Sequence, residues 1–421
     1  MDKFVINGGK SLSGKVKVSG AKNSALALMP ATLLNNGNNL IENVPEVNDI
    51  YTMMKLLKKL GASASFDNKK LTLDTTEINS QIAPYEHVKK MRASVYVLGP
   101  LLAKYGYAKV SMPGGCAWGP RPINLHLEAM KKFGATIDLE QGYIIAKSSK
   151  LSGARINFDI SSVGATGNAL MAAVLAKGET IITNAASEPE ITQLAQFLIS
   201  MGAKIEGIGS NILEIEGVDS LQPADIVNIP DRIEAGTLMI AAAITKGNIE
   251  LVGINYKHLN LPIQKLEDSG VKILLDNNLV IVDAVDYSPK NIDLTTGVYP
   301  GFPTDLQAQW TAYMSLVPGS SKIVDTIYHD RFKHIPELNR LGANIEVLRN
   351  SALVKGVEKL KGATVMSTDL RASASLVLAG LVASGTTEVL RIYHLDRGYE
   401  RIEEKLNSLG ADIKRVKTQE F

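Results

Sequence analysis

The sequence predicts an α/β protein of two similar lobes, each built from three repeated units. Three observations support this: a short phrase that recurs six times, helices that are apolar on every side, and helices that are apolar on one side only. The phrase has the form Leu/Phe/Met-Gly-Ala-x-hydrophobic or a near variant, and its glycines are Gly61, Gly134, Gly202, Gly270, Gly342 and Gly410. These glycines are 73, 68, 68, 72 and 68 residues apart, which is the signature of an internal repeat.

Each repeat begins with an apolar helix that a glycine is expected to end, because glycine adopts the left-handed conformation common after a helix C-terminus. The helices are expected in runs such as 24–36, 93–105, 168–177 and 372–384. The closing glycines are Gly37, Gly106, Gly178, Gly247, Gly319 and Gly385. The run 169–176 is apolar nearly all round, so this helix must be buried on every side.

A short strand follows each closing glycine, as in the segments 180–182, 248–252, 322–324 and 388–390. A polar loop and a second helix come next. In 399–409 the apolar residues fall at helical spacing with charged residues between them, which indicates a helix with one buried face. Each unit therefore offers a buried helix, a surface helix and strands.

The six units divide into two groups of three, with a boundary near 222–225. The expected arrangement is two similar lobes that face each other across a cleft. Clefts between lobes are common sites for small-molecule chemistry.

Composition excludes several classes of protein. The 421 residues include 45 Lys and Arg against 43 Asp and Glu, which argues against a nucleic-acid or membrane-surface role driven by bulk charge. The N-terminus has no basic region followed by a long apolar run, and no stretch approaches eighteen apolar residues. One cysteine cannot form an internal disulfide, which agrees with a reducing compartment. We expect a cytoplasmic protein.

The only cysteine, Cys116, lies in a loop with three glycines and three prolines within residues 113–122. This composition excludes ordinary helix or strand. A lone cysteine is often a small buried hydrophobe. The alternative is a reactive thiol, which the glycines leave accessible and which the charge of Arg121 favours as thiolate. Both readings remain open from the local sequence.

Polar residues recur at the start of the buried helices. Basic residues there oppose the helix dipole, so Lys22, Arg92, Arg232 and Arg371 indicate an anionic ligand. The acids Asp231, Asp305 and Asp369 have two interpretations, helix N-caps or catalytic groups.

A second polar place is the loop after the strand. Arg331 and Arg397 each lie 12 residues beyond a closing glycine, Gly319 and Gly385, and are therefore equivalent. The equivalent loops of other units carry Cys116, Arg121, Glu188 and Glu190. No metal site is expected, because the six histidines form no pair at metal-binding spacing and one cysteine cannot build a zinc framework.

Several motifs together resemble one family. They are the segments 19–25, 91–94, 113–116, 121–122, 162–166, 230–232, 302–305 and 369–374. In this order they are similar to UDP-N-acetylglucosamine enolpyruvyl transferases of the EPSP synthase-like superfamily, from the first residues to about Ala411. Asn124 departs from the family, which usually has an aspartate there.

The resemblance implies an inside-out α/β barrel in each lobe, with helices inside and sheets outside. The first lobe would comprise residues 22–229, and the second residues 1–21 plus 230–421. It also implies a transferase that moves the enolpyruvyl group of phosphoenolpyruvate to the 3′-hydroxyl of UDP-N-acetylglucosamine and releases phosphate. This is the first committed step of peptidoglycan synthesis, which supports cell shape and division. No cofactor and no obligate protein partner are implied.

The family's roles carry over to matching positions. Cys116 would protonate carbon-3 of the enol, and Asp305 would accept the sugar proton. Lys22, Arg121 and Arg397 would hold the phosphate and carboxylate. The remaining expected substrate contacts and supports are Asn23, Arg92, Pro122, Ile123, Asn124, Leu125, Val163, Ile327, Arg331, Asp369 and Arg371.

Two alternatives remain. The shikimate-pathway enolpyruvyl transferase shares architecture and donor but does not use the cysteine loop. A binding paralogue would hold UDP-sugar without turnover, which the altered loop residues Trp118, Pro120 and Asn124 could allow. An active enzyme is expected to be alkylated at Cys116 by the epoxide fosfomycin.

Overall fold

The computed structural model describes residues 2–89, 91–112 and 123–418. Contacts divide these into two compact units, one formed by the residues up to Ser19 with those from Pro230 on, the other by Gly20–Ile229. Each unit has its own hydrophobic core. The two points at which the chain passes from one lobe to the other were expected between residues 21 and 22 and between residues 229 and 230. The predicted mixed α/β class is confirmed.

The strands described in Gly20–Ile229 form three four-stranded sheets with one pattern: an edge strand pairs in parallel, and the other two pairings are antiparallel. The first sheet is β14 (Ile226–Val227), β3 (Asn38–Glu42), β5 (Lys70–Asp74) and β4 (Ser63–Asp67). The second is β6 (Ile82–Ala83), β7 (Tyr107–Ser111), β9 (Tyr143–Lys147) and β8 (Thr136–Glu140). The third is β10 (Arg155–Asn157), β11 (Glu179–Thr183), β13 (Ile212–Glu216) and β12 (Lys204–Glu206).

The other unit repeats this pattern in its described residues. Its first sheet is β16 (Lys272–Asp276), β17 (Leu279–Asp283), β15 (Asn248–Val252) and β2 (Ser13–Lys17). Its second is β18 (Leu294–Thr295), β19 (Ser320–Val324), β21 (Ser351–Lys355) and β20 (Asn344–Leu348). The last is β22 (Thr364–Met366), β23 (Thr386–Leu390), β1 (Asp2–Asn7) and β24 (Ile413–Lys417). Here the N-terminal strand β1 pairs antiparallel with both β23 and β24. In the corresponding position, each of the other sheets has a strand from late in its own repeat.

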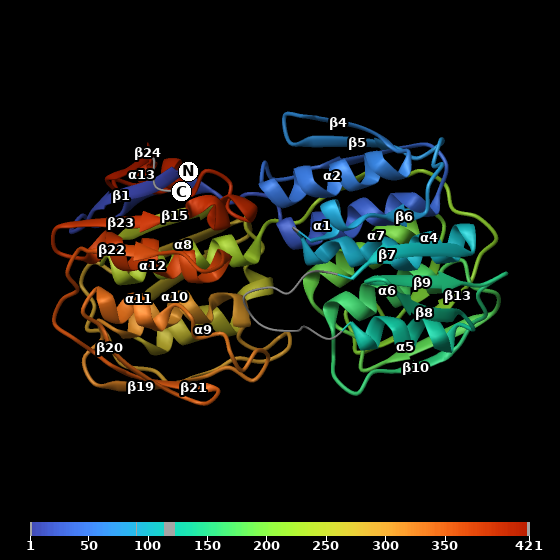
Figure 1. The fold of residues 1–421 in the computed structure, drawn as a ribbon. Coiled ribbons are helices and arrows are strands. Elements are labelled where there is room, and N and C mark those ends of the chain that lie inside the picture. The colour runs from blue at the N-terminus through green and yellow to red at the C-terminus, as the bar shows by residue number, and fades with distance from the viewer. Residues whose placement is uncertain (1, 90, 113–122, 419–421) are drawn as a thin grey trace. The chain divides into compact units, whose positions relative to one another are not determined.

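Each repeat contributes one largely buried helix. These are α1 (Lys22–Ala31), α4 (Leu98–Tyr105), α6 (Val163–Ala173), α8 (Arg232–Ile244), α10 (Gln307–Met314) and α12 (Leu370–Val382). In α4 the last three residues are half-buried. Figure 1 shows α8, α10 and α12 inside their unit, with the strands of its sheets around them. Such helices carry no polar face because every side contacts protein.

The remaining helices are shorter or lie at the surface. They are α2 (Asn48–Leu60), α3 (Tyr85–Val88), α5 (Asn124–Lys132), α7 (Pro189–Ser200), α9 (Asn260–Asp268), α11 (Ile335–Arg340) and α13 (Ile402–Ser408). Five 3₁₀ helices are also described: η1 (Thr32–Leu34), η2 (Arg92–Val97), η3 (Tyr256–Leu259), η4 (Thr304–Leu306) and η5 (Ile392–Arg397). The described helices include none long and apolar enough to cross a membrane.

Two local expectations need correction. Gly247 does not adopt a left-handed conformation; Lys246 does, with φ 50°, and a Cβ on Gly247 would lie 2.3 Å from the Leu12 carbonyl oxygen. That glycine is required for close backbone approach. The surface helix expected over 399–409 begins only at Ile402, because Arg401 is left-handed with φ 43°.

Candidate active site

The polar residues predicted at the starts of the buried helices lie there, but the three acids differ. Asp231 and Asp369 are N-caps of α8 and α12, and each carboxylate accepts two backbone N–H bonds. Asp305 is within the 3₁₀ helix η4, just before α10, and its side chain forms no cap. Of the three, Asp305 is therefore the one whose carboxylate serves another purpose.

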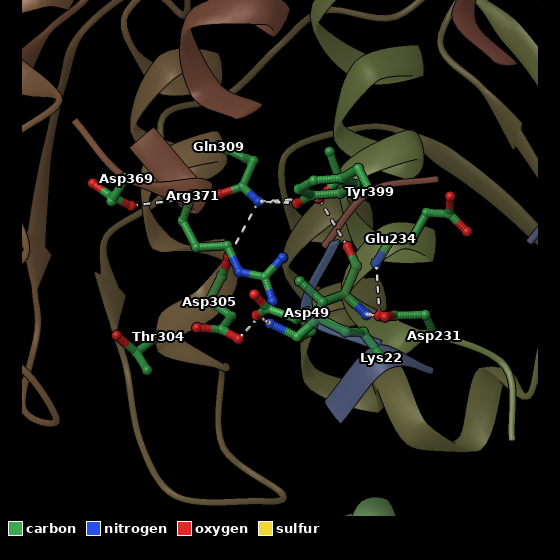
Figure 2. Close-up of polar contacts among 12 residues, drawn as sticks. Lys22, Asp49, Asp231, Glu234, Thr304, Asp305, Gln309, Asp369, Arg371 and Tyr399 are labelled. Carbon is green, nitrogen blue, oxygen red and sulfur yellow. Dashed lines mark hydrogen bonds and ion pairs between the residues drawn. The ribbon is translucent and has the colours of Figure 1, made fainter. Parts of the chain in front are cut away.

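Two buried arginines hold the Asp305 carboxylate. Nη2 of Arg331 lies 2.7 Å from Oδ1, and Nη2 of Arg371 lies 2.8 Å from Oδ2. Both guanidinium side chains are 6% exposed, whereas the Asp305 side chain is 25% exposed. Figure 2 shows the Arg371 guanidinium directed toward Asp305. The carboxylate is thus oriented from the protein side and still accessible.

The electrostatics keep this carboxylate ionised. Burial alone would raise the pKa of Asp305, but the charges and hydrogen bonds of Arg371 and Arg331 outweigh it and hold that pKa well below 3.8. Burial would lower the pKa of Arg371, but Asp305, Tyr399 and Asp231 together outweigh it and raise that pKa.

A second layer of contacts fixes Arg331. Its Nη1 donates to Thr304 Oγ1 at 3.0 Å, and that hydroxyl donates to Oδ2 of the buried Asp325 at 2.6 Å. The other oxygen of Asp325 accepts bonds from the backbone of Ile327 at 3.0 Å and Tyr328 at 2.8 Å. Asp325 therefore ties the loop that carries Arg331 to the start of η4.

Arg371 is fixed from the opposite side. Its guanidinium carbon lies 5.4 Å from the centre of the Tyr399 ring, a cation–π contact. The Tyr399 hydroxyl bonds Thr237 at 2.8 Å and accepts from Gln309 at 3.1 Å. Figure 2 shows Gln309 and Tyr399 beside Arg371.

Two expected residues of this unit lie outside these contacts. Arg397 ends η5 and is half-buried, and Ile327 is half-buried in the turn after β19.

In the other unit, Lys22 is the first residue of α1. Its Nζ donates to Oδ2 of Asp49 on α2 at 3.1 Å, and the two side chains are 11% and 5% exposed. Figure 2 shows this pair. A cation at a helix N-terminus opposes the dipole, and Asp49 offsets that charge.

Other expected residues of this unit occupy helix starts. Asn23 is half-buried on α1, Arg92 begins η2, and Val163 begins α6. The Val163 carbonyl accepts a bond from the Tyr96 hydroxyl at 3.4 Å, which joins η2 to α6.

The start of α5 is held by a neutral histidine. Burial, aided by the charge of Arg92, lowers the pKa of His126 to about 3. Its Nδ1 lies 2.8 Å from the amide nitrogen of Asn168, which also bonds the Val95 carbonyl. The expected contacts Ile123, Asn124 and Leu125 adjoin this helix start. Asn124 is exposed, and Ile123 and Leu125 are half-buried.

Cys116, Arg121 and Pro122 lie outside the described residues, as do Trp118 and Pro120. Among the described residues there is no group of three or more His, Cys, Asp and Glu that could hold a metal ion.

Sequence reasoning missed several residues that support the site. They are Asp49, Thr304, Asp325, Gln309 and Tyr399. Of these, Thr304 adjoins Asp305, which the motif at 302–305 had indicated. The others come from distant segments, and no spacing in the sequence relates them to their partners.

Comparison with known proteins identifies the relatives of this fold and site. The chain is 58% identical over 424 residues to UDP-N-acetylglucosamine 1-carboxyvinyltransferase of Prosthecochloris aestuarii, and 57% identical over 427 residues to that of Chlorobium chlorochromatii. In both comparisons all of each chain is covered. The chain belongs to the UDP-N-acetylglucosamine 1-carboxyvinyltransferase family.

Broader comparisons agree with this family. Residues 6–406 match the family model described as EPSP synthase (3-phosphoshikimate 1-carboxyvinyltransferase). The enolpyruvyl transferase NikO from Streptomyces tendae superposes with a TM-score of 0.91 at 26% identity, covering 99% of both chains. EPSP synthase from Acinetobacter baumannii superposes at 0.77 with 19% identity, covering 99% of this chain and 100% of its own. The second likeness shows the fold alone. The predicted family and enzyme class are confirmed, and the chain is a transferase.

Proposed function

We propose that this protein transfers the enolpyruvyl group of phosphoenolpyruvate to the 3′-hydroxyl of UDP-N-acetylglucosamine and releases phosphate, as the first committed step of peptidoglycan synthesis. The observation that carries the proposal is 55–58% identity over full length to relatives that bear the name of this activity. The expected cytoplasmic location stays a prediction.

The first step is addition. The sugar hydroxyl oxygen attacks carbon-2 of the enol, carbon-3 takes a proton from the Cys116 thiol, and the hydroxyl proton passes to Asp305. The product is a tetrahedral ketal that still carries phosphate. The acid and base act on different atoms, so two separate groups are needed.

The second step is elimination. Carbon-3 returns a proton to the Cys116 thiolate, the double bond to carbon-2 forms again, and the bond from carbon-2 to the phosphate oxygen breaks, with the departing phosphate taking the proton from Asp305. Lys22, Arg121 and Arg397 hold the phosphate and carboxylate, because a multiply charged anion requires several fixed cations.

The strongly acidic Asp305 suits the base role in a specific way. A carboxylate with a pKa well below 3.8 is a weak base toward a free hydroxyl. It accepts a hydrogen bond at any physiological pH and so orients the 3′-hydroxyl. The proton moves late, as the new carbon–oxygen bond makes that hydroxyl acidic. Arg331, Arg371 and Asp369 support this geometry.

The UDP-sugar is bound by residues at the helix starts and the turn after β19. The proposed contacts are Asn23, Arg92, Arg121, Pro122, Ile123, Asn124, Leu125, Val163, Asp305 and Ile327. Asn124, exposed at the start of α5, supplies an amide where the family usually has a carboxylate.

Phosphate release tests the activity. With phosphoenolpyruvate and UDP-N-acetylglucosamine we expect continuous phosphate release, and none above background with shikimate-3-phosphate as acceptor. Release with the shikimate acceptor alone would assign the chain to the other enolpyruvyl transferase. Tight binding of the sugar nucleotide without release would favour a binding paralogue.

Fosfomycin tests the thiol separately. After incubation with the epoxide and UDP-N-acetylglucosamine, the intact mass should rise by one adduct, which a Cys116→Ser variant should lack. An unmodified wild-type mass would argue against Cys116 as a reactive acid.

A further inference from the structure

The segment that carries Arg397 has an unusual backbone. It runs from the end of β23 through η5 to the start of α13, and Arg391 and Arg401 bound it with φ angles of 57° and 43°. Residues other than glycine rarely adopt this left-handed backbone conformation. Such a segment persists only when surrounding contacts determine it.

One set of contacts lies at Asp396, the residue directly before Arg397. Arg415 donates from Nη2 to Oδ1 at 2.7 Å and from Nη1 to Oδ2 at 3.1 Å. The two bonds form the parallel, bidentate pair that fixes a carboxylate's orientation as well as its position.

Arg415 joins three elements. It lies on β24, its Nε donates to Glu403 on α13 at 2.7 Å, and its guanidinium carbon lies 5.1 Å from the centre of the Phe4 ring on β1. The η5 segment is therefore tied through one side chain to a helix and to two strands of a sheet.

Buried residues hold the segment on both sides of Arg397. Ile392 and Leu395 are fully buried, and Tyr399 is 2% exposed with its hydroxyl bonded to Thr237 and Gln309. The backbone at Arg397 is thus enclosed between the Asp396 clamp and the Tyr399 anchor.

We propose that Arg415 is a positioning residue for phosphoenolpyruvate binding, because it clamps Asp396 and thereby sets the direction of Arg397. The proposal rests on the proposed function, in which Arg397 holds the anionic donor. Arg415 and Asp396 are each 30% exposed. The effect that distinguishes a positioning role is expected on substrate binding.

The first test replaces Arg415 with lysine, which keeps the charge but cannot make the bidentate pair. We expect the KM for phosphoenolpyruvate to rise roughly 10-fold, because small misplacements of binding groups are costly. The KM for UDP-N-acetylglucosamine should change little. Asp396→Asn should give the same pattern.

Asp2→Asn is the matched control. Asp2 also contacts Arg415, at 3.5 Å, but it lies on β1 and not on the Arg397 segment. This variant should leave the KM for phosphoenolpyruvate unchanged. An equal rise in the KM for phosphoenolpyruvate in this control would show that losing any contact of Arg415 has the same effect, and would overturn the proposal.

A double-mutant cycle tests the route through Arg397. In an Arg397→Lys background, Arg415→Lys should raise the KM for phosphoenolpyruvate much less than it does alone. The same fold-increase in both backgrounds would assign Arg415 a merely structural role. Wild-type protein that releases no phosphate would refute the proposed function itself; active wild type with an unchanged KM in Arg415→Lys would refute only this inference.

Discussion

At the scale of single residues, Asp305 differs from its counterparts in the other repeats. The sequence left three acids with two interpretations, and the structure separates them by their hydrogen bonds. Asp231 and Asp369 bond backbone N–H groups, whereas Asp305 bonds two arginines. The motif could indicate Asp305, but not that Arg331 from the same repeat and Arg371 from the next repeat would meet it.

Asp305→Asn should remove the proton acceptor and keep the size of the side chain. We expect kcat to fall about 10²- to 10⁴-fold, the usual contribution of a general base. Initial rates of phosphate release measure it. Asp330→Asn is the control, since Asp330 is exposed beside Arg331 and should keep wild-type kcat. A loss of less than about 10-fold in Asp305→Asn would exclude the base role.

The two arginines also predict a pH effect. In the wild type the Asp305 pKa lies well below 3.8, so protonation of this group should not reduce kcat/KM above about pH 4. Arg331→Met removes one cation and should therefore raise that pKa. The loss of kcat/KM toward acid should then appear at a higher pH in the variant than in the wild type. If kcat/KM depends on pH in the same way in the wild type and in Arg331→Met, the proposed effect of the two arginines on Asp305 is contradicted.

At the scale of elements, the repeat places each buried helix so that its first residues carry the site. A lack of polar residues on any side predicted which helices are buried, because burial on every side leaves no polar face. Helix ends were predicted less well. Arg401 and Lys246 adopt left-handed conformations that no pattern indicates, and the Tyr399 side chain packs against Arg371 instead of lying on a surface helix.

The N-cap of α12 gives an element-scale prediction. Asp369→Ala removes bonds to two N–H groups, one of them that of Arg371, and should lower the free energy of unfolding by about 1 kcal/mol. Activity should fall as well, because Arg371 is the second helical residue and bonds Asp305. Asp369→Ser, which can still cap, should restore most of the stability. Denaturant titration checks both, and equal stability of all three proteins would contradict the cap.

At the scale of the whole molecule, the sequence predicted the class and the number of repeats because one phrase recurs six times at similar intervals. It could not predict which side chains from separate segments of the chain meet. Asp325 supports Arg331 through Thr304, and Arg415 clamps the segment of Arg397. These contacts depend on tertiary packing, which places residues far apart in the chain within hydrogen-bond reach.

The proposed reaction is an enolpyruvyl transfer to UDP-N-acetylglucosamine that needs the Asp305 carboxylate. Mass spectrometry of the sugar nucleotide after incubation with phosphoenolpyruvate tests this most directly. We expect wild-type protein to convert the nucleotide to a product heavier by one enolpyruvyl group, with one phosphate released per product, and Asp305→Asn to form it far more slowly. A sugar nucleotide of unchanged mass after incubation with the wild type, or equal conversion by the variant, would contradict the account.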